Sequence, residues 1–184
     1  KLGLPMSSIE QQFSRMTFNI LARNQDDHCK NIAFLMDQSG KWTLSPAYDI
    51  TFSYNPSGVW TGRHQMTLNG KRDHFTVDDF IACADNSGMK RGAALEILNQ
   101  VQQTLENWNA FAEIAGIPGQ TSKEIGAHHR LHILDGTSQA AFNRTNMTNA
   151  HYISPRTLTC PVNSLQSAPD KTNNADNDIH NSPE

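Results

Sequence analysis

A short polar segment near the N-terminus carries the residue types that phosphoryl transfer requires. Residues 24–31 read NQDDHCKN, and residues 45–49, which read SPAYD, end at Asp49. Asp26 precedes Asn31 by five positions, and Asp49 follows Asn31 by eighteen. In a kinase, one carboxylate receives the proton of the substrate hydroxyl, while an Asn and an Asp hold magnesium against the nucleotide phosphates. These two segments are therefore a candidate site for phosphoryl transfer.

The Asp-to-Asn spacing is a weak signal without its context. The same spacing recurs between Asp176 and Asn181, in a polar stretch where nothing apolar flanks the match to fix its geometry. Asp26, in contrast, follows an apolar helical pattern and precedes a strand-like run. Such a layout could bring Asp26, Asn31 and Asp49 around one centre of phosphate and metal, and we interpret the later match as chance.

A predicted helix precedes the first candidate segment, and a predicted hairpin separates it from the second. Apolar residues at Ile9, Phe13, Met16 and Ile20 predict one helical face over residues 8–22. A capping box of Ser7 with Glu10 is expected to start this helix. The short runs 32–36 and 42–44, separated by turn residues, predict a β-hairpin. Pro46 blocks strand continuation and leaves Asp49 on an irregular segment.

The rest of the sequence predicts further helices, followed by a polar segment of different composition. Thr76 is expected to cap a helix that runs to about Ala84, one long helix is expected over 89–115, and another over 121–134. Residues 53–75 suit a loop with at most one hairpin. From residue 136 onwards Asn, Ser, Thr and Pro dominate, so we predict one folded domain over 1–135 and a largely disordered polar tail over 136–184. The inner face of the long helix is expected to consist of Ala94, Ile97, Val101, Leu105, Trp108 and Ala112.

Composition excludes several classes of protein. The net charge of −3 and pI near 6.2 give no basic surface for direct nucleic-acid binding. No apolar run approaches the roughly 20 residues that cross a bilayer. The three cysteines lack C-x-x-C spacing, which argues against a disulfide framework or zinc site and indicates a reducing cytoplasm.

Residues 8–134 resemble the HipA family, serine/threonine kinases that are the toxins of bacterial toxin–antitoxin pairs. The resemblance rests on residues 18–34, which begin FNILARNQDDH, and on residues 44–50, LSPAYDI. It implies a mainly α fold with a small β-hairpin, similar to the C-terminal lobe of protein-kinase-like enzymes. It also implies ATP and Mg²⁺ as cofactors, a protein substrate (a translation component in related toxins) and a DNA-binding antitoxin as partner.

The resemblance also assigns roles to individual residues. Asp26 would be the catalytic base, and Asn31 and Asp49 would ligate magnesium, a cation that prefers oxygen ligands. His28, Cys29 and Lys30 would lie in the stretch that contacts the nucleotide, where Lys30 would pair with phosphate.

Other polar residues near these motifs have ordinary structural explanations. Asp27 is expected to be solvated or to cap the loop, and His28 could brace the loop through the backbone. Cys29 is expected to contribute only its backbone. Residues 128–130, which read HHR, suit a solvated helix face, and Asp73 suits a turn.

The sequence lacks the parts that hold the other side of a nucleotide: a glycine-rich phosphate loop, a nucleotide-anchoring Lys and an adenine hinge. In the HipA family those parts precede this region, so we expect the isolated chain to bind ATP poorly and transfer little phosphate. Three alternatives stay open. They are a small-molecule kinase of the aminoglycoside or choline type, a non-catalytic toxin remnant that binds a partner, and a metal-dependent phosphohydrolase built on Asp26, Asp27, His28 and Asp49.

Overall fold

The computed structural model describes residues 2–134, which form a mainly helical fold with one two-stranded antiparallel sheet. The predicted fold class is therefore confirmed. The predicted tail over 136–184 and the chance match at Asp176 lie outside the described residues. In chain order the elements are α1 (Met6–Leu21), the 3₁₀ turn η1 (Cys29–Asn31), β1 (Phe34–Met36), β2 (Trp42–Leu44), α2 (Val77–Asn86), α3 (Arg91–Glu106), α4 (Trp108–Ile114) and α5 (Gly119–Gly126).

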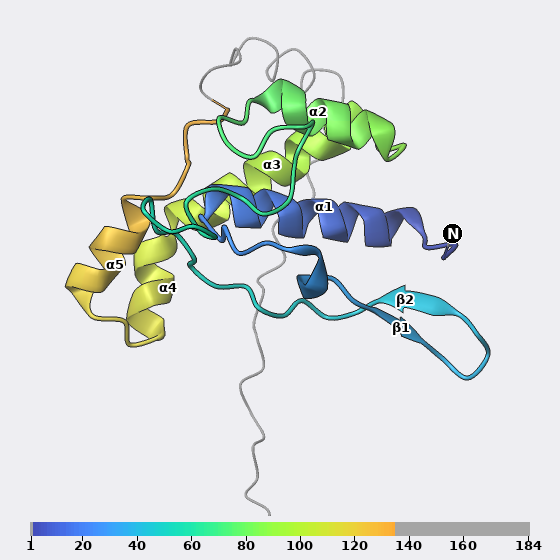
Figure 1. Cartoon of the computed structure of the whole chain (residues 1–184), viewed down its shortest axis with the longest axis horizontal. Coiled ribbons are helices and arrows are strands. Elements are labelled where there is room, and N and C mark those ends of the chain that lie inside the picture. Colours follow the sequence, from blue (N-terminus) through green and yellow to red (C-terminus); the bar gives the residue numbers. More distant parts are fainter. Residues whose placement is uncertain (1, 135–184) are drawn as a thin grey trace, which may run out of the picture. The chain divides into compact units, whose positions relative to one another are not determined.

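The core forms where α1 and α2 pack against α3 (Figure 1). Phe13 of α1 meets Phe80 of α2 edge to face, with ring centroids 6.3 Å apart. Leu21 and Leu98 are fully buried, and complete burial of a side chain of this size contributes roughly 1.5–3 kcal/mol. The predicted apolar stripe of α1 is correct in phase, because Phe13 and Ile20 are buried while Ile9 and Met16 pack partly buried against the core.

The expected start of the first helix is wrong, whereas that of α2 is correct. Pro5 is the extended N-cap residue of α1, and Ser7 already lies inside the helix, so no side chain caps this end. At α2, Thr76 and Asp79 form a full capping box, in which each side chain hydrogen-bonds the other residue's backbone amide.

The predicted long helix over 89–115 is two helices, with a break at Asn107. The Asn107 amide donates to Thr104 O, and its side-chain amide donates to Gln103 O, which ends α3. Trp108 then starts α4, and its indole N–H donates to Ser122 O of α5 at 2.8 Å. The break lets α4 turn and pack on α5, a contact that a continuous helix could not make.

The helix predicted over 121–134 is also wrong in its bounds, since α5 ends at Gly126. Gly126 approaches Trp108 so closely that a Cβ at this position would lie 3.0 Å from the indole Cδ1. Residues 127–134 instead leave the helix and return to the end of α1, where the Arg130 amide donates to Leu21 O at 2.8 Å. This return brings residues 128–130 beside the candidate site.

The hairpin is present as predicted and extends away from the helices (Figure 1). Phe34 pairs with Leu44, and Met36 pairs with Trp42. Asp37 holds the turn, because its Oδ1 accepts hydrogen bonds from the amides of Ser39 and Lys41. All three residues of β1 are exposed although all are apolar. Among the described residues, no helix combines the length and apolar character required to span a bilayer.

Candidate functional site

The loop after α1 is held beside the segment that follows Asp49. Gln25 N donates to Ser53 O, and Ser53 N donates to Arg23 O, which makes a short parallel bridge between the two segments. Asn24 adds side-chain contacts across the same junction. Its buried amide Nδ2 lies 3.1 Å from both Asn19 Oδ1 and the backbone oxygen of Asp49. Both halves of the candidate site are thus attached to the end of α1.

The structure brings Asn31 and Asp49 into direct contact. Asn31 lies in η1, and its Nδ2 donates to Asp49 Oδ2 at 2.7 Å. The same nitrogen lies 3.1 Å from the backbone oxygen of Asp26. One amide therefore connects all three segments that carry the predicted residues, and no described residue donates a hydrogen bond to Asn31 Oδ1.

The backbone of Asp49 adopts an unusual conformation. Its φ is +54°, a left-handed value that costs a non-glycine residue of order 1 kcal/mol and persists only where surrounding contacts enforce it. Two such contacts lie nearby. Asn24 Nδ2 bonds the Asp49 carbonyl, and Tyr48 Oη donates to Lys30 O at 2.6 Å, which ties the segment before Asp49 to η1.

The other predicted site residues surround the contact between Asn31 and Asp49. The Asp26 carboxylate is 43% exposed, and its Oδ1 lies 3.9 Å from His28 Nε2. His28 Nδ1 is buried without a hydrogen-bond partner among the described residues, so this atom does not brace the loop. Cys29 and Lys30 are exposed at the surface of η1. The Asp26 carboxylate is therefore accessible to solvent.

Asp27 was expected either to be solvated or to cap the loop, and the first expectation is wrong. Its side chain is 10% exposed, and Oδ2 lies 2.8 Å from Nδ1 of His64. Its Oδ1 accepts hydrogen bonds from the amides of Gln65 and Met66. The alternative expectation, a carboxylate that caps the loop, is therefore correct, although the capped segment lies almost forty residues further along the chain.

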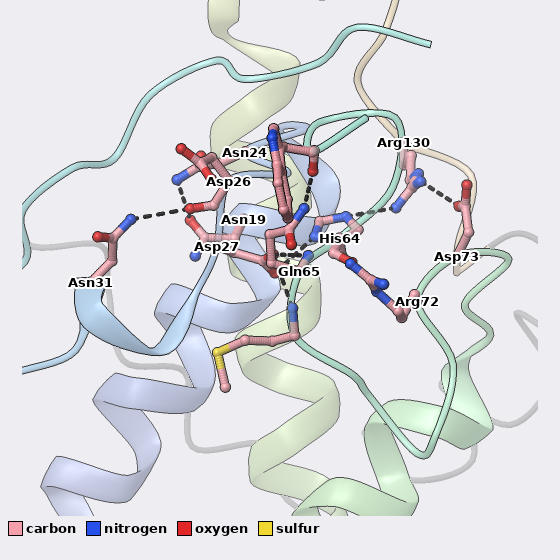
Figure 2. Close-up of polar contacts among 12 residues, drawn as sticks. Asn19, Asn24, Asp26, Asp27, Asn31, His64, Gln65, Arg72, Asp73 and Arg130 are labelled. Atoms are coloured by element: carbon pink, nitrogen blue, oxygen red, sulfur yellow. Dashed lines mark hydrogen bonds and ion pairs between the residues drawn. The ribbon is translucent and has the colours of Figure 1, made fainter. Parts of the chain in front are cut away.

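Figure 2 shows that this contact continues as a row of polar side chains. His64 Nε2 lies 3.1 Å from Nη1 of Arg130, and Nη2 of Arg130 pairs with Asp73. Burial, reinforced by the charge of Arg23, lowers the pKa of Arg130. Burial acts to raise the pKa of Asp73, but the His74 amide and Arg130 oppose it, and the net pKa is lowered.

The expectation that residues 128–130 form a solvated helix face is wrong. None of them lies in a helix, and the Arg130 side chain is only 13% exposed. His128 stacks on Phe52 with ring centroids 6.1 Å apart, and its carbonyl accepts a hydrogen bond from Arg23 Nε. Burial, together with the nearby His128, lowers the pKa of His129, which packs against Trp108. Sequence reasoning missed His64 entirely, since an isolated His in a loop of Gly and polar residues carries no spacing signal.

The donor set suits magnesium bound together with a nucleotide. Magnesium keeps several waters and is held by one or two carboxylates plus substrate phosphates, and Asp49 with the amide oxygen of Asn31 supplies oxygens of the required kind. Within residues 2–134, no three His, Cys, Asp or Glu side chains are grouped as a metal site. A metal-dependent phosphohydrolase gains no support, because Asp27 faces His64 in the interior instead of joining Asp26 and Asp49.

Comparison with known proteins identifies a matching family and a similar solved structure. The family model described as HipA-like C-terminal domain matches residues 2–108, more than half of the chain. A solved structure of the toxin–antitoxin system HipA and HipB with its operator DNA, from Shewanella oneidensis MR-1, has a similar fold. The TM-score is 0.54 at 22% sequence identity, and the similarity covers 71% of this chain but 31% of that chain. The curated proteins provide no match.

Proposed function

Because the chain belongs to the family of HipA-like C-terminal domains, we propose that it is the catalytic lobe of an ATP-dependent serine/threonine protein kinase. The observation that supports this proposal is the contact of 2.7 Å between Asn31 Nδ2 and Asp49 Oδ2, beside the backbone of Asp26. A kinase requires one carboxylate for the hydroxyl proton and two oxygen ligands for magnesium. The contact joins the two candidate magnesium ligands and connects them to the backbone of the residue that would supply the carboxylate.

Each residue has a distinct role in this proposal. The Asp26 carboxylate orients the substrate hydroxyl and accepts its proton. Asp49 and the amide oxygen of Asn31 would hold magnesium, which would supply positive charge next to the phosphates of a bound nucleotide. Lys30, a compact cation at the same surface, adds positive charge near the γ-phosphate. His28, the N-cap residue of η1, and Cys29, its first residue, would belong to the stretch that contacts the nucleotide.

The proposed lobe spans residues 1–135 and works together with a nucleotide-binding lobe. The similar structure is about three times longer than the region it shares with this chain, since the match covers 31% of it. β1 provides a surface for such a lobe, because Leu35 and Met36 are 54% and 58% exposed. The isolated chain should bind ATP weakly, because positioning catalysis requires both sides of the nucleotide.

By analogy with the complex of HipA, HipB and operator DNA, the partner is a DNA-binding antitoxin and the compartment is the cytoplasm. The substrate is a serine or threonine on a protein, with a translation component as the first candidate. The exposed apolar strand β1 also suits the second candidate function, a non-catalytic remnant that retains only a partner-binding surface.

Phosphate transfer by the complete protein, meaning this chain together with its nucleotide-binding lobe, separates these possibilities. With ATP and magnesium, the wild type should label a polypeptide, and Asp26→Asn should reduce the rate by about 10²–10⁴-fold without loss of folding. Asp85→Asn, the same change at an exposed position on α2, is the matched control and should leave the rate unchanged. Labelling of an alcohol such as an aminoglycoside would favour the small-molecule kinase instead. A wild type that labels neither class would leave the partner-binding remnant.

A further inference from the structure

Three segments that are distant in sequence meet in one buried polar row. Asp27 belongs to the candidate catalytic loop, His64 to the long loop before α2, and Arg130 to the segment after α5. Asp27 Oδ2 lies 2.8 Å from His64 Nδ1, and His64 Nε2 lies 3.1 Å from Arg130 Nη1. His64 is 1% exposed, so water cannot replace either partner. None of these three side chains has a part in the proposed chemistry.

The two partners determine the protonation state of His64. A guanidinium can only donate hydrogen bonds, so Nε2 of His64 must present a lone pair to Arg130. Asp27 is a carboxylate that accepts, so Nδ1 of His64 must carry the proton. The imidazole is therefore neutral and in a single tautomer. It links Arg130 to Asp27 through one hydrogen bond on each side, and this hydrogen-bonded row of Arg130, His64 and Asp27 is called the relay below.

Arg130 is itself fixed from several sides. Its guanidinium pairs with Asp73 and lies 5.5 Å from the centroid of the Phe75 ring. Its backbone amide bonds Leu21 O at the end of α1. Arg130 also lies outside residues 2–108, the range that the family model matches.

Asp27 connects His64 to the loop that carries Asp26. Its Oδ1 accepts hydrogen bonds from Gln65 N at 2.7 Å and Met66 N at 3.3 Å, so both carboxylate oxygens are committed to the segment that contains His64. The peptide bond between Asp26 and Asp27 consequently has little freedom. The exposed Asp26 carboxylate has no comparable anchor among the described residues, and its Oδ1 lies 3.9 Å from His28 Nε2.

We propose that Arg130 is a positioning residue for the proposed kinase reaction, and that it acts on Asp26 through His64 and Asp27. The proposal rests on the proposed function for its catalytic consequence, while the relay itself is a property of this chain. Arg130 touches neither substrate nor nucleotide. Arg130 stabilises the neutral tautomer of His64. His64 in turn restricts the position of Asp27 and of the loop that carries Asp26, the proposed base.

The first test is spectroscopic and needs no activity. In the full chain with ¹⁵N-labelled histidine, NMR should show His64 with a proton on Nδ1 and none on Nε2. Arg130→Met should shift the Nε2 resonance and increase amide exchange at Gln65 and Met66 about tenfold. Arg91→Met, the same change at an exposed position of α3, should alter neither. A wild-type His64 protonated on Nε2 overturns the relay, as does an Arg130→Met spectrum identical to that of the wild type.

The second test uses the complete protein and separates positioning from general damage. Arg130→Met should lower kcat about ten- to a hundredfold, as small misplacements of catalytic groups do, while the KM for ATP stays within a factor of two. Asp27→Asn should lower kcat similarly, and the double variant should be no slower than the slower single variant, because both changes interrupt one relay. Arg130→Lys keeps a cationic donor and should recover part of the loss.

The two proposals fail in different ways. If the wild type transfers no phosphate, the proposed function fails, and the spectroscopic test still decides whether the relay exists. If the wild type is active but Arg130→Met keeps its kcat, or if the two losses multiply in the double variant, the positioning role is refuted alone. If Arg130→Met does not fold, Arg130→Lys is measured in its place. A kcat between those of the wild type and Asp27→Asn, with the His64 tautomer retained, supports the positioning role. An unchanged kcat, or a loss beyond that of Asp27→Asn, contradicts it.

Discussion

The side-chain amide of Asn31 donates to Asp49 Oδ2 at 2.7 Å, although eighteen positions separate the two residues. The whole hairpin lies between them in the chain. The contact depends on the return of the chain to the end of α1, where Asn24 bonds the Asp49 carbonyl. The hairpin thus separates the two candidate magnesium ligands in sequence while the bridge at residue 53 brings them together in space.

Divalent metal should bind weakly but specifically at this pair, even without nucleotide. Millimolar Mn²⁺ added to the full chain should broaden the backbone NMR signals of Asn31 and Asp49 before those of other acidic residues. Asp49→Ala should abolish this selective broadening because it removes the only carboxylate in contact with Asn31 among the described residues. Asp85→Ala serves as the control and should leave it intact. Equal broadening in wild type and Asp49→Ala would place the metal elsewhere.

Removal of the Asn24 side chain should loosen Asp49 and destabilise the fold. Asn24 is 2% exposed, and Asn24→Ala leaves the Asp49 carbonyl and Asn19 Oδ1 without their donor. Loss of such buried partners costs about 1–3 kcal/mol, measurable by urea unfolding. Asn86→Ala, at the exposed end of α2, should change the unfolding free energy by less than about 0.5 kcal/mol. We also expect the Asp49 amide resonance to move only in the first variant.

Ionised Asp79 should contribute to the free energy of unfolding, and this contribution should disappear in acid. Burial by itself raises its pKa, but hydrogen bonds from Lys71, Asn69 and Thr76 outweigh burial and lower the pKa from 3.8 to about 2. A lowered pKa means that the folded state favours the ionised form. The stabilisation is therefore present above pH 4 and is lost as the pH falls through about 2.

The difference in unfolding free energy between wild type and Asp79→Asn measures this effect. It should amount to about 1–2 kcal/mol near neutral pH, since Lys71 is half exposed and solvent screens part of the pairing. The difference should shrink steadily between pH 4 and pH 2. A difference that does not depend on pH would show that the carboxylate contributes only through its shape and neutral hydrogen bonds.

Leu98 should matter more to stability than Ile97, its neighbour in α3. Leu98 is fully buried, whereas Ile97 is only partly buried against the core. Leu98→Ala should cost about 3–5 kcal/mol, as expected when a cavity forms in a close-packed interior. Ile97→Ala should cost clearly less in the same urea unfolding experiment. Ala94, Val101 and Leu105 are buried as predicted, whereas Ile97 was expected on the inner face and Leu98 was not. Equal costs would contradict the deeper burial of Leu98.

Local sequence patterns were sufficient to predict the type and order of most helices and strands. The apolar period of four and three over Ile9, Phe13, Met16 and Ile20 identified α1, and Thr76 with Asp79 identified the start of α2. The turn chemistry of Asp37 and Gly40 identified the hairpin. These signals are local, because helix phase, capping and turn conformation depend on residues within one or two turns of the chain.

The local signals failed where a distant contact decides the outcome. The break at Asn107 depends on Trp108 reaching Ser122, and the end of α5 depends on the return of Arg130 to Leu21. In each case packing overrides helical preferences that differ by less than 1 kcal/mol per residue.

The candidate site divides in the same way. Residue types and spacing indicated Asp26, Asn31 and Asp49, because phosphoryl transfer needs a fixed set of oxygen-bearing groups. The folded arrangement was needed to show that Asn31 contacts Asp49. It was also needed to show that Asp27 faces inward to His64, which in turn contacts Arg130. Contacts between residues that are tens of positions apart produce no periodic pattern in the sequence. They arise because the folded backbone brings distant segments next to each other.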